Sequence, residues 1–511
     1  DSLFAGLKNP YRISDDPALT QTLGWTDAWT SQPSSYVVAA TSAADVAAAV
    51  DFARNHRVKL VIKGGGHSYF GNSNASNSLL LWTRKLDRID QHDDFVPIGA
   101  PPATAPLTAV SVGAGCLWGQ IYRDTAVAHG RYVQGGGCLT VGVGGFVLGG
   151  GFGSFSKAFG TGAANLLEAE IVTADSKVWT VSEWSDPELF FALRGGGGGT
   201  FGIVTRLTMR TFELPATIGA VLFEVKANDD NSWRALVEKM IAFYADHLCS
   251  PQWGEQIRFS PGRKMSITMT AQGLSSEQIA ALWKPFFSWV KGQSPVYAMA
   301  DPLILAVPAR DFWNPEFLKK MPGIVLGDDR PGASTDNIFW ASNLGETGQV
   351  LHAYKSRWLP KGLLKGQGRA RLVDAIVAGS AEWSIGLHTN KGLAGGDPAA
   401  IERSRRTATS KQMLDAFALV IVAAEGPPAW PGIPRHSPDN ALGRKEAAGV
   451  ERAFAPFEAL TPGAGCYMSE ADYFGRDWRT AYWGDNYPRL LAAKRRYDPT
   501  GLFTGHHTIG T

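Results

Sequence analysis

Two side chains that can form covalent bonds, His67 and Cys138, each follow three consecutive glycines at the end of a predicted strand. An imidazole nitrogen and a thiolate are both nucleophiles. Glycine lets the backbone approach another object closely, because it has no Cβ and tolerates positive φ. A third glycine run, from Arg194 to Thr200, lies in the same half of the chain. The pattern indicates a flat or charged ligand lying against these loops.

Each residue alone also has an ordinary structural interpretation. A single histidine after glycines fits a polar network, and a single cysteine is most often a small buried apolar residue. The repetition of the same context at His67 and Cys138 favours a shared function.

The composition excludes several classes of protein. The chain has 511 residues, of which 44% are hydrophobic and 19% charged, so it can bury a sizeable core in two or more domains. A net charge of +2 favours neither nucleic acid nor a membrane surface as a partner. Apolar stretches are too short to cross a bilayer. We expect a monomer that binds a small molecule.

Cysteine usage argues against a metal site. Cys116, Cys138, Cys249 and Cys466 lie far apart without a C-x-x-C pair, so no zinc site is expected and one disulfide stays open. The chain starts at Asp1, which fits a removed export signal or a trimmed chain, and Asn74-Ala75-Ser76 is a glycosylation triplet. We expect secretion or periplasmic export and leave a cytoplasmic location open.

The first 215 residues read as alternating strands and helices. "SYVVAATS" predicts a strand, Ser42 a helix N-cap, "AADVAAAVDFARNHR" a helix and "KLVIKGGGHS" a buried strand. This βαβ-like opening lacks the G-x-G-x-x-G spacing of a Rossmann fingerprint. Further strands are expected in "LTAVSVGAG", "EAEIVTADSKVWTV" and "FGIVTRLTMRTF".

After residue 215 the pattern changes to long helices mixed with strands. "WRALVEKMIAFYADHL" and "SSEQIAALWKPFFSWV" predict helices, whereas "EQIRFS" and "KMSITMTA" predict strands. A last helix is expected from Pro488 to Tyr497. We therefore predict an α+β protein with domains at 1–215 and 216–460 and a C-terminal segment at 461–511.

Several motifs together resemble the berberine-bridge-enzyme-like branch of the vanillyl-alcohol-oxidase family, which are oxidases with a bicovalently attached FAD. The motifs are "GGGHS", "GGGCLTVGVGG" with "LGGGFG", "RGGGGGTFGIVT", "YWGDNYPRL" and "YDPTGLF", and the resemblance covers nearly the whole chain. It implies a two-subdomain FAD-binding unit at 1–215, a substrate domain at 216–460 whose sheet roofs the flavin, and a C-terminal segment that returns to the FAD-binding unit.

The resemblance also implies cofactor contacts. His67 would bond the 8α-methyl group of the flavin and Cys138 its ring carbon 6. The loop from Lys63 to Ser68, which holds Gly64, Gly65 and Gly66, and the turn with Gly137, Thr140, Gly142 and Gly145 would contact the cofactor, with backbone N–H groups toward the pyrophosphate. Gly202, Ile203 and Val204 would line the adenine side. Phe146 stands where relatives commonly carry a histidine, so flavin contacts near Phe146 and Ala164 stay open.

The catalytic base is sought in the tail, because hydride transfer to a flavin leaves a hydroxyl proton to be accepted. Glu470, Tyr473 and Tyr482 are the candidates, and the resemblance makes Tyr482 the matching position, with Asn486 orienting flavin or substrate. A tyrosine, whose pKa is ordinarily about 10, must be activated for this role. An aromatic that packs between domains is the alternative for Tyr482.

Two further features bear on substrate and acceptor. In relatives a gate for dioxygen lies three positions after the linked cysteine, here Val141, and valine there is associated with access, although a strand-core valine fits equally. The second domain is rich in tryptophan, whose faces stack on sugars and on planar rings. These are Trp253, Trp283, Trp289, Trp313, Trp340, Trp358 and Trp383.

The leading hypothesis is an FAD-dependent oxidase of a substrate hydroxyl, of a sugar or oligosaccharide first, that passes electrons to dioxygen and releases hydrogen peroxide. Oxidation of an aryl alcohol, an alkaloid or a polyketide-type metabolite is the alternative. A flavin-carrying binding protein without turnover, or a binding module without cofactor, are the non-enzymatic alternatives.

Overall fold

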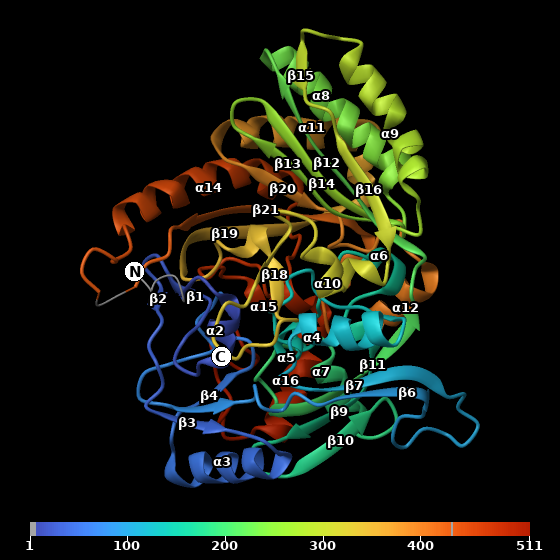
Figure 1. The fold of residues 1–511 in the computed structure, drawn as a ribbon. Helices are drawn as coiled ribbons and strands as arrows, with labels where there is room; N and C mark the ends of the chain where they lie inside the picture. The colour runs from blue at the N-terminus through green and yellow to red at the C-terminus, as the bar shows by residue number, and fades with distance from the viewer. Residues whose placement is uncertain (1–6, 431–432) are drawn as a thin grey trace.

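The computed structural model describes residues 7–430 and 433–511 and divides them into two halves (Figure 1). A ten-stranded sheet with helices on its outer side forms the upper half of the view. Two smaller sheets, one of three strands and one of six, form the lower half. This mixed architecture confirms the predicted α+β class.

The three-stranded sheet contains the predicted βαβ-like opening. Its strands pair in parallel in the order β3-β5-β4, and the connecting helix is α3. Ser42 caps that helix as expected, because its Oγ accepts a hydrogen bond from Asp45 N at 3.2 Å and Asp45 bonds back in a capping box. The bounds are β3 (Tyr36–Ala39), α3 (Ala43–His56), β4 (Leu60–Lys63) and β5 (Leu79–Trp82).

The six-stranded sheet is antiparallel and follows the order β10-β9-β11-β7-β6, with β8 paired to β11. The three strand segments expected here are present, and "EAEIVTADSKVWTV" forms the β9–β10 hairpin. The strands are β6 (Ile89–Phe95), β7 (Leu107–Gly113), β8 (Arg131–Val133), β9 (Leu166–Val172), β10 (Val178–Ser182) and β11 (Ile203–Glu213). Short helices connect them: α4 (Trp118–Tyr122), α5 (Val143–Leu148), α6 (Ser156–Phe159) and α7 (Pro187–Leu193).

The ten-stranded sheet runs β15-β12-β14-β13-β20-β21-β19-β1-β2, and β16 also pairs with β12. Four long helices cover its outer face (Figure 1). The strands are β12 (Thr217–Ala227), β13 (Trp253–Ser260), β14 (Lys264–Gln272), β15 (Tyr297–Met299), β16 (Leu303–Pro308), β19 (Gln349–Pro360), β20 (Ile385–His388) and β21 (Ala416–Gly426). The helices are α8 (Asp230–Phe243), α9 (Ser276–Lys291), α11 (Gly366–Glu382) and α14 (Asn440–Leu460).

The first strands of the chain also belong to this large sheet. β1 (Thr22–Trp25) pairs in parallel with β19, and β2 (Trp29–Thr30) forms the edge beside it. Residues 22–30 therefore lie in the sheet of the upper half, although the sequence grouped them with the FAD-binding unit. A small two-stranded sheet of β17 (Val325–Gly327) and β18 (Ile338–Trp340) lies between the halves.

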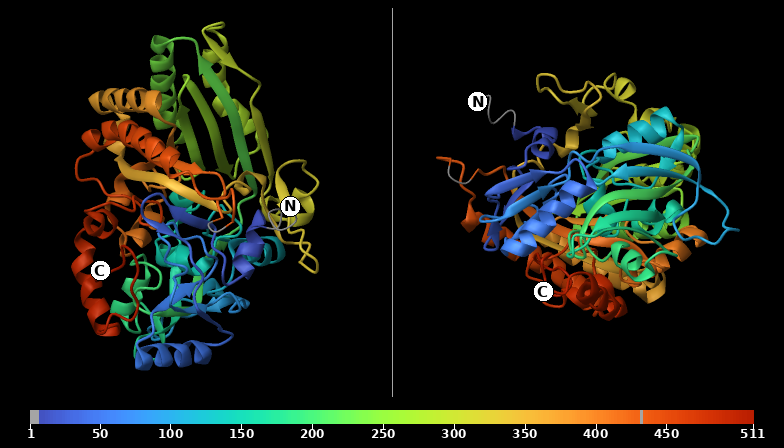
Figure 2. Two further views of the ribbon diagram at one scale, coloured as in Figure 1. Left: turned by 90° about the vertical axis from the view of Figure 1, so that its left-hand side faces the viewer. Right: turned by 90° about the horizontal axis from the view of Figure 1, so that it is seen from below.

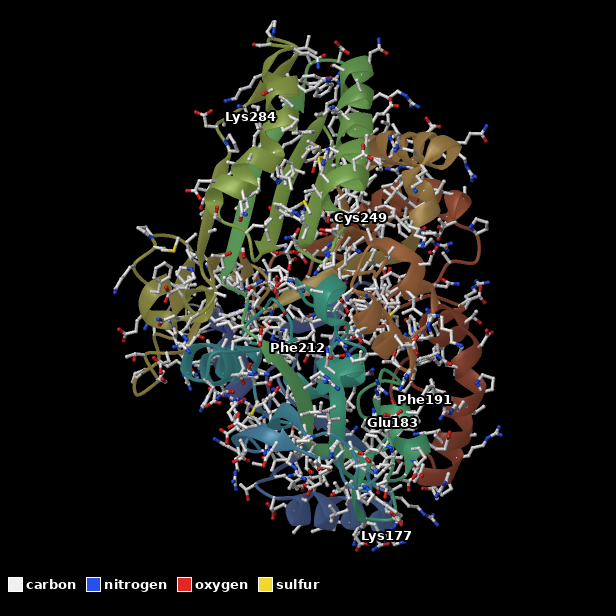
Figure 3. All side chains as sticks on the ribbon, turned by 90° about the vertical axis from the view of Figure 1, so that its right-hand side faces the viewer. Lys177, Glu183, Phe191, Phe212, Cys249 and Lys284 are labelled. Atoms are coloured by element: carbon white, nitrogen blue, oxygen red, sulfur yellow. The ribbon has the colours of Figure 1, made fainter. Side chains whose placement is uncertain are left out.

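The four cysteines are unpaired, so the disulfide left open by the sequence is not formed. Cys249 lies in the upper half (Figure 3), where its Sγ is 3.4 Å from Ala394 O. Across residues 7–430 and 433–511, no helix is long and apolar enough to span a membrane. The same residues contain no cluster of three or more side chains suited to a metal ion.

The C-terminal segment packs along the lower half (Figure 2, left). It contains α15 (Trp478–Trp483) and α16 (Tyr487–Tyr497), which contains the predicted helix. Lys494 on α16 is buried and donates hydrogen bonds to Asp498 Oδ2 at 2.6 Å and Thr200 O at 2.7 Å. Asp498 in turn accepts from Phe503 N at 2.9 Å. This network fixes the tail against the strand entrance at Thr200.

We expect Lys494→Met to lower the free energy of unfolding by about 3–5 kcal/mol, because it leaves the Asp498 carboxylate buried without its cation. Arg489→Met is the matched control on the same helix, since Arg489 pairs with Glu188 at an exposed site, 2.7 Å apart, and should cost at most about 1 kcal/mol. Urea unfolding followed by tryptophan fluorescence measures both. Equal losses would contradict the role of the buried network.

Candidate active site

A cavity of about 1190 Å³ lies between the two halves. Its walls are the glycine-rich loops of the lower half, the inner face of the ten-stranded sheet and the C-terminal turn at residues 503–508. Ligand sites commonly occupy about 300–1,000 Å³. This cavity therefore has room for a dinucleotide cofactor together with a substrate.

His67 and Cys138 both line the cavity and meet at one hydroxyl. Thr140 Oγ1 lies 3.4 Å from His67 Nε2 and 3.5 Å from Cys138 Sγ. His67 follows β4 through the loop after Lys63, and Cys138 follows β8 through Gln134–Gly137. The fold thus brings together the two nucleophiles that the sequence placed in equivalent glycine contexts.

Burial keeps both nucleophiles uncharged. Loss of solvation lowers the pKa of His67 to about 4, opposed by a hydrogen bond with the Thr140 backbone. Loss of solvation raises the pKa of the Cys138 thiol to about 11, and the nearby Glu346 carboxylate adds to that rise, while hydrogen bonds from Thr140 oppose it. At neutral pH the site contains a neutral imidazole and a protonated thiol.

The glycines around these residues serve two purposes. A Cβ on Gly65 would lie 2.7 Å from Gly142 N, and a Cβ on Gly135 would lie 2.1 Å from the Trp118 ring, so these glycines allow chain segments to touch each other. A Cβ on Gly137 or on Gly145 would have no atom of the described residues within 4 Å, so these two glycines leave open space at the cavity. At Gly137 and Gly145 the missing side chain provides the space beside a ligand that the sequence suggested.

Most predicted cofactor residues line the cavity. They are Gly64, Gly65, Gly66, His67, Ser68, Gly137, Cys138, Gly142, Gly145, Gly202, Ile203 and Val204. Val141, the predicted oxygen gate, lines it as well. Phe146 also faces the cavity, with its ring in an edge contact with Trp118.

Three predicted cofactor residues do not line the cavity. The Lys63 side chain is fully buried and donates to Asp16 O at 2.6 Å, so it anchors the N-terminal segment. Thr140 is buried behind His67 and Cys138. Asn486 donates to Ala408 O and Thr409 O, at 3.0 and 3.2 Å, and supports a loop.

Two of the three predicted bases, Tyr473 and Tyr482, also do not line the cavity. Tyr482 is buried, its hydroxyl lies 3.0 Å from His507 Nδ1, and burial raises its pKa well above the ordinary value. Tyr473 stacks on His506 with ring centroids 3.7 Å apart. The histidines, rather than these tyrosines, line the cavity. The position of Tyr482 matches the packing alternative and does not support its role as a base.

Glu470, the third candidate, does line the cavity. Its carboxylate accepts a hydrogen bond from Lys391 Nζ at 2.6 Å, and its backbone carbonyl accepts one from Ser356 Oγ. These contacts hold a carboxylate at the cavity wall, close to the end of β20.

Sequence patterns did not single out a group of polar residues on β13, at the end of β20 and in the turn after β20. Glu255 bonds Ser154 Oγ and adopts φ +71°, an uncommon conformation for a residue with a side chain, which marks a constrained position. Asn390 is 4% exposed, and its Oδ1 has no hydrogen-bond partner among the described residues. Both line the cavity, as does His388. The alternating strand pattern gave no signal for them, because any exposed sheet face is polar at such positions.

Of the tryptophans noted in the sequence, two face the cavity. Trp313 and Trp340 line it, and Trp340 Nε1 donates to Gly137 O at 2.8 Å. Trp253, Trp283 and Trp358 are instead buried in the cores.

The residues present fit an FAD. The cavity holds a pair of nucleophiles, His67 and Cys138, beside glycines whose missing side chains leave space, Gly137 and Gly145. Both nucleophiles are within reach of one bound ring system, because a single hydroxyl touches each of them.

Comparisons with known proteins agree with an FAD-binding protein. Residues 34–182 match the family described as "FAD binding domain", and residues 465–510 match "Berberine and berberine like". The chain is 30% identical to an FAD-linked oxidoreductase of Arthroderma benhamiae over 478 residues, which are 93% of this chain and 77% of that protein.

Solved structures share the fold. The VAO-type flavoprotein MtVAO615 of Myceliophthora thermophila has a TM-score of 0.78 at 24% identity and matches 100% of this chain and 88% of that one. The glucooligosaccharide oxidase of Acremonium strictum, which carries a 6-S-cysteinyl, 8α-N1-histidyl FAD, has a TM-score of 0.71 at 20% identity over 100% and 99%. The chain is therefore an FAD-linked oxidoreductase and belongs to the berberine-bridge-enzyme-like branch of the vanillyl-alcohol-oxidase family.

Proposed function

We propose that this oxidoreductase oxidises a hydroxyl-bearing carbon of a small molecule, a sugar or oligosaccharide first, with an FAD bonded to His67 and Cys138 and with dioxygen as the acceptor that becomes hydrogen peroxide. One observation carries the proposal: His67 and Cys138 both line the same cavity, and each lies within 3.5 Å of the Thr140 hydroxyl.

When bound, FAD supplies a hydride acceptor. The chain must hold the flavin ring and accept the proton of the substrate hydroxyl. His67 and Cys138 fix the ring, so that fewer side chains need to close over it. Glu470, held by Lys391, accepts the hydroxyl proton from the substrate, since it is the predicted base that lines the cavity.

The polar residues of the sheet support a hydroxylated substrate. One carboxylate oxygen of Glu255 is bonded by Ser154, and Asn390 Oδ1 is an unpaired buried acceptor. A buried polar group without a partner costs free energy, so these groups favour a ligand that carries hydrogen-bond donors. Trp340, which is half-buried at the cavity, adds an aromatic surface against which a pyranose face can pack.

A second candidate substrate is an aryl alcohol, an alkaloid or a polyketide-type metabolite. The apolar residues of the cavity wall favour it, since Leu303, Leu305 and Val307 of β16 line the cavity, as do Phe317 and Ile324. An apolar body would bury its surface in that region.

Anaerobic mixing with a panel of sugars, oligosaccharides and aryl alcohols tests the proposal. Bleaching of the flavin by a carbohydrate, followed by peroxide formation on admission of air, is the expected result. Bleaching by aryl alcohols alone would select the second candidate. A flavin reduced by no member of either class would contradict the proposed substrate chemistry.

We expect the flavin to remain with the protein after acid precipitation. Single His67→Ala and Cys138→Ala variants should each retain one bond to the flavin, and only the double variant should release FAD into the acid supernatant. Flavin absorbance of pellet and supernatant measures the outcome. Free FAD in the supernatant of the unmodified protein would contradict covalent attachment.

We expect Glu470→Gln to slow anaerobic flavin reduction by roughly a hundredfold or more, the size of a general-base contribution. Tyr482→Phe should change the rate only slightly, because the ring still packs and only the contact with His507 is lost. Stopped-flow absorbance compares the two variants. A large loss in Tyr482→Phe with none in Glu470→Gln would return the role to the tyrosine.

We expect the reduced enzyme to react quickly with dioxygen and Val141→Ile to slow that reaction, because the added methylene fills space at the cavity wall. Stopped-flow mixing of photoreduced protein with air-saturated buffer gives both rates. Slow reoxidation of the unmodified protein, with rapid electron transfer to dyes, would indicate a dehydrogenase instead.

A further inference from the structure

Thr140 is placed to move a proton between the two nucleophiles. Its side chain is buried, and its hydroxyl lies 3.5 Å from Cys138 Sγ and 3.4 Å from His67 Nε2. A threonine hydroxyl donates one hydrogen bond and can accept another. The three atoms therefore form the chain Sγ, Oγ1, Nε2, with no other side chain needed between them.

The loop that carries Thr140 is held from outside the cavity. Gly119 N donates to Leu139 O at 2.8 Å, and Trp118 N donates to Val141 O at 3.1 Å. On the other side, the contact of Gly65 with Gly142 fixes the His67 loop against the same turn. Backbone contacts thus fix both loops that carry the three-atom chain relative to each other.

The Nε2 atom of His67 can act toward the Thr140 hydroxyl either as a hydrogen-bond donor or as an acceptor. Because its pKa is lowered to about 4, His67 is neutral, with one N–H and one acceptor nitrogen. Nε2 faces Thr140, which leaves Nδ1 as the nucleophile for the flavin. While Nδ1 keeps its lone pair, the proton is on Nε2, which then donates to Thr140. Once Nδ1 is bonded to carbon and the Nε2 proton has left, Nε2 becomes an acceptor.

Cys138 needs such an acceptor. The thiolate is the nucleophile, and burial together with the Glu346 carboxylate raises the pKa of the thiol to about 11. Glu346 is itself engaged, because Asn343 Nδ2 donates to its Oε1 at 2.8 Å and Gln21 Nε2 to its Oε2 at 3.3 Å. The side-chain partner of the Cys138 thiol is the Thr140 hydroxyl, whose Oγ1 lies 3.5 Å from Sγ.

We infer that Thr140 is a positioning residue for flavin attachment: its hydroxyl passes the Cys138 proton to His67 Nε2, so that the histidyl bond forms first and promotes the cysteinyl bond. The inference rests on the proposed bicovalent FAD and adds an order and a residue to it.

Each attachment balances with dioxygen as oxidant. In the first, Nδ1 forms a bond to the 8α carbon, one C–H proton and the imidazole proton leave, and two electrons and these two protons convert O₂ to H₂O₂. In the second, Cys138 loses its proton through Thr140 to Nε2 while Sγ bonds ring carbon 6, whose hydrogen leaves as a proton. The same two-electron transfer to a second O₂ restores the oxidised ring and consumes both protons.

The experiment follows both bonds in time. Full-length protein prepared without flavin is mixed with FAD in air, samples are quenched in acid, and mass spectrometry measures the flavin on the peptides containing His67 and Cys138. In Thr140→Val, which keeps the shape and loses the hydroxyl, the histidyl bond should form at nearly the normal rate. The cysteinyl bond should form about a hundredfold more slowly.

Two further variants separate proton transfer from simple packing. Thr140→Ser retains the hydroxyl and should restore the cysteinyl rate. His67→Ala should slow the cysteinyl bond by a factor similar to Thr140→Val, although the bond still completes at long times. The double variant should be no slower than either single one, because both act through one proton path.

Separate outcomes overturn this inference and the proposed attachment. If the unmodified protein forms neither bond, the bicovalent cofactor itself is contradicted. If it forms both bonds while Thr140→Val or His67→Ala keeps the normal cysteinyl rate, the proton path through Thr140 is wrong and the proposed function stands. FAD fluorescence quenching confirms binding in each variant, and should Thr140→Val fail to bind, the His67→Ala rate decides.

Discussion

The site depends on a backbone contact between two loops, the one that carries His67 and the one that carries Cys138. Gly65 and Gly142 approach so closely that a Cβ on either would lie 2.7 Å from a backbone nitrogen of the other loop. This approach sets the loop after β4 directly against the turn after β8, and it brings both His67 and Cys138 within 3.5 Å of Thr140 Oγ1. A side chain at either glycine would separate the loops and with them the nucleophiles.

The same closeness determines the protonation state of the site. Both side chains are half-buried against the packed loops, and the loss of solvation keeps the imidazole neutral and the thiol protonated. A neutral imidazole suits nucleophilic attack, whereas a protonated thiol does not. The fold thus makes His67 ready to react and leaves Cys138 dependent on a proton acceptor, which is why the hydroxyl between them has chemical consequences.

Much of the fold follows from local sequence signals. The helix over Ala43–His56 has its capping box and apolar stripe in the sequence, and the strand before His67 is a short apolar run that ends in glycines. The strands at Thr22–Trp25 and Trp29–Thr30 could not be assigned to the large sheet, because β1 pairs with β19, more than 300 residues later, and β2 joins the sheet through β1. Pairing over such distances is set by the tertiary fold and not by the local pattern.

The site itself was predictable only in part. The glycine contexts identified His67 and Cys138, but the tail offered Glu470, Tyr473 and Tyr482 with similar chemistry. Only burial separates them: Tyr482 is enclosed behind His507, and Glu470 reaches the cavity. The role of Lys63 could not be predicted from the sequence either. Its ammonium group donates a hydrogen bond to Asp16 O in the N-terminal segment and does not line the cavity.

On both sides of the cavity, a glycine allows two backbone segments to touch. On the sheet side, a Cβ on Gly254 would lie 1.8 Å from Ser154 O, so strand β13 touches the loop of the lower half directly. The next residue, Glu255, is held at positive φ by this contact and by Thr389, whose N and Oγ1 each donate to its carbonyl at 2.8 Å. On each side, then, a glycine permits a backbone contact, and a reactive or polar side chain close by is directed into the cavity. Gly65, Gly142 and Gly254 therefore mark where segments touch, and His67 and Glu255 follow two of these contacts closely in the sequence.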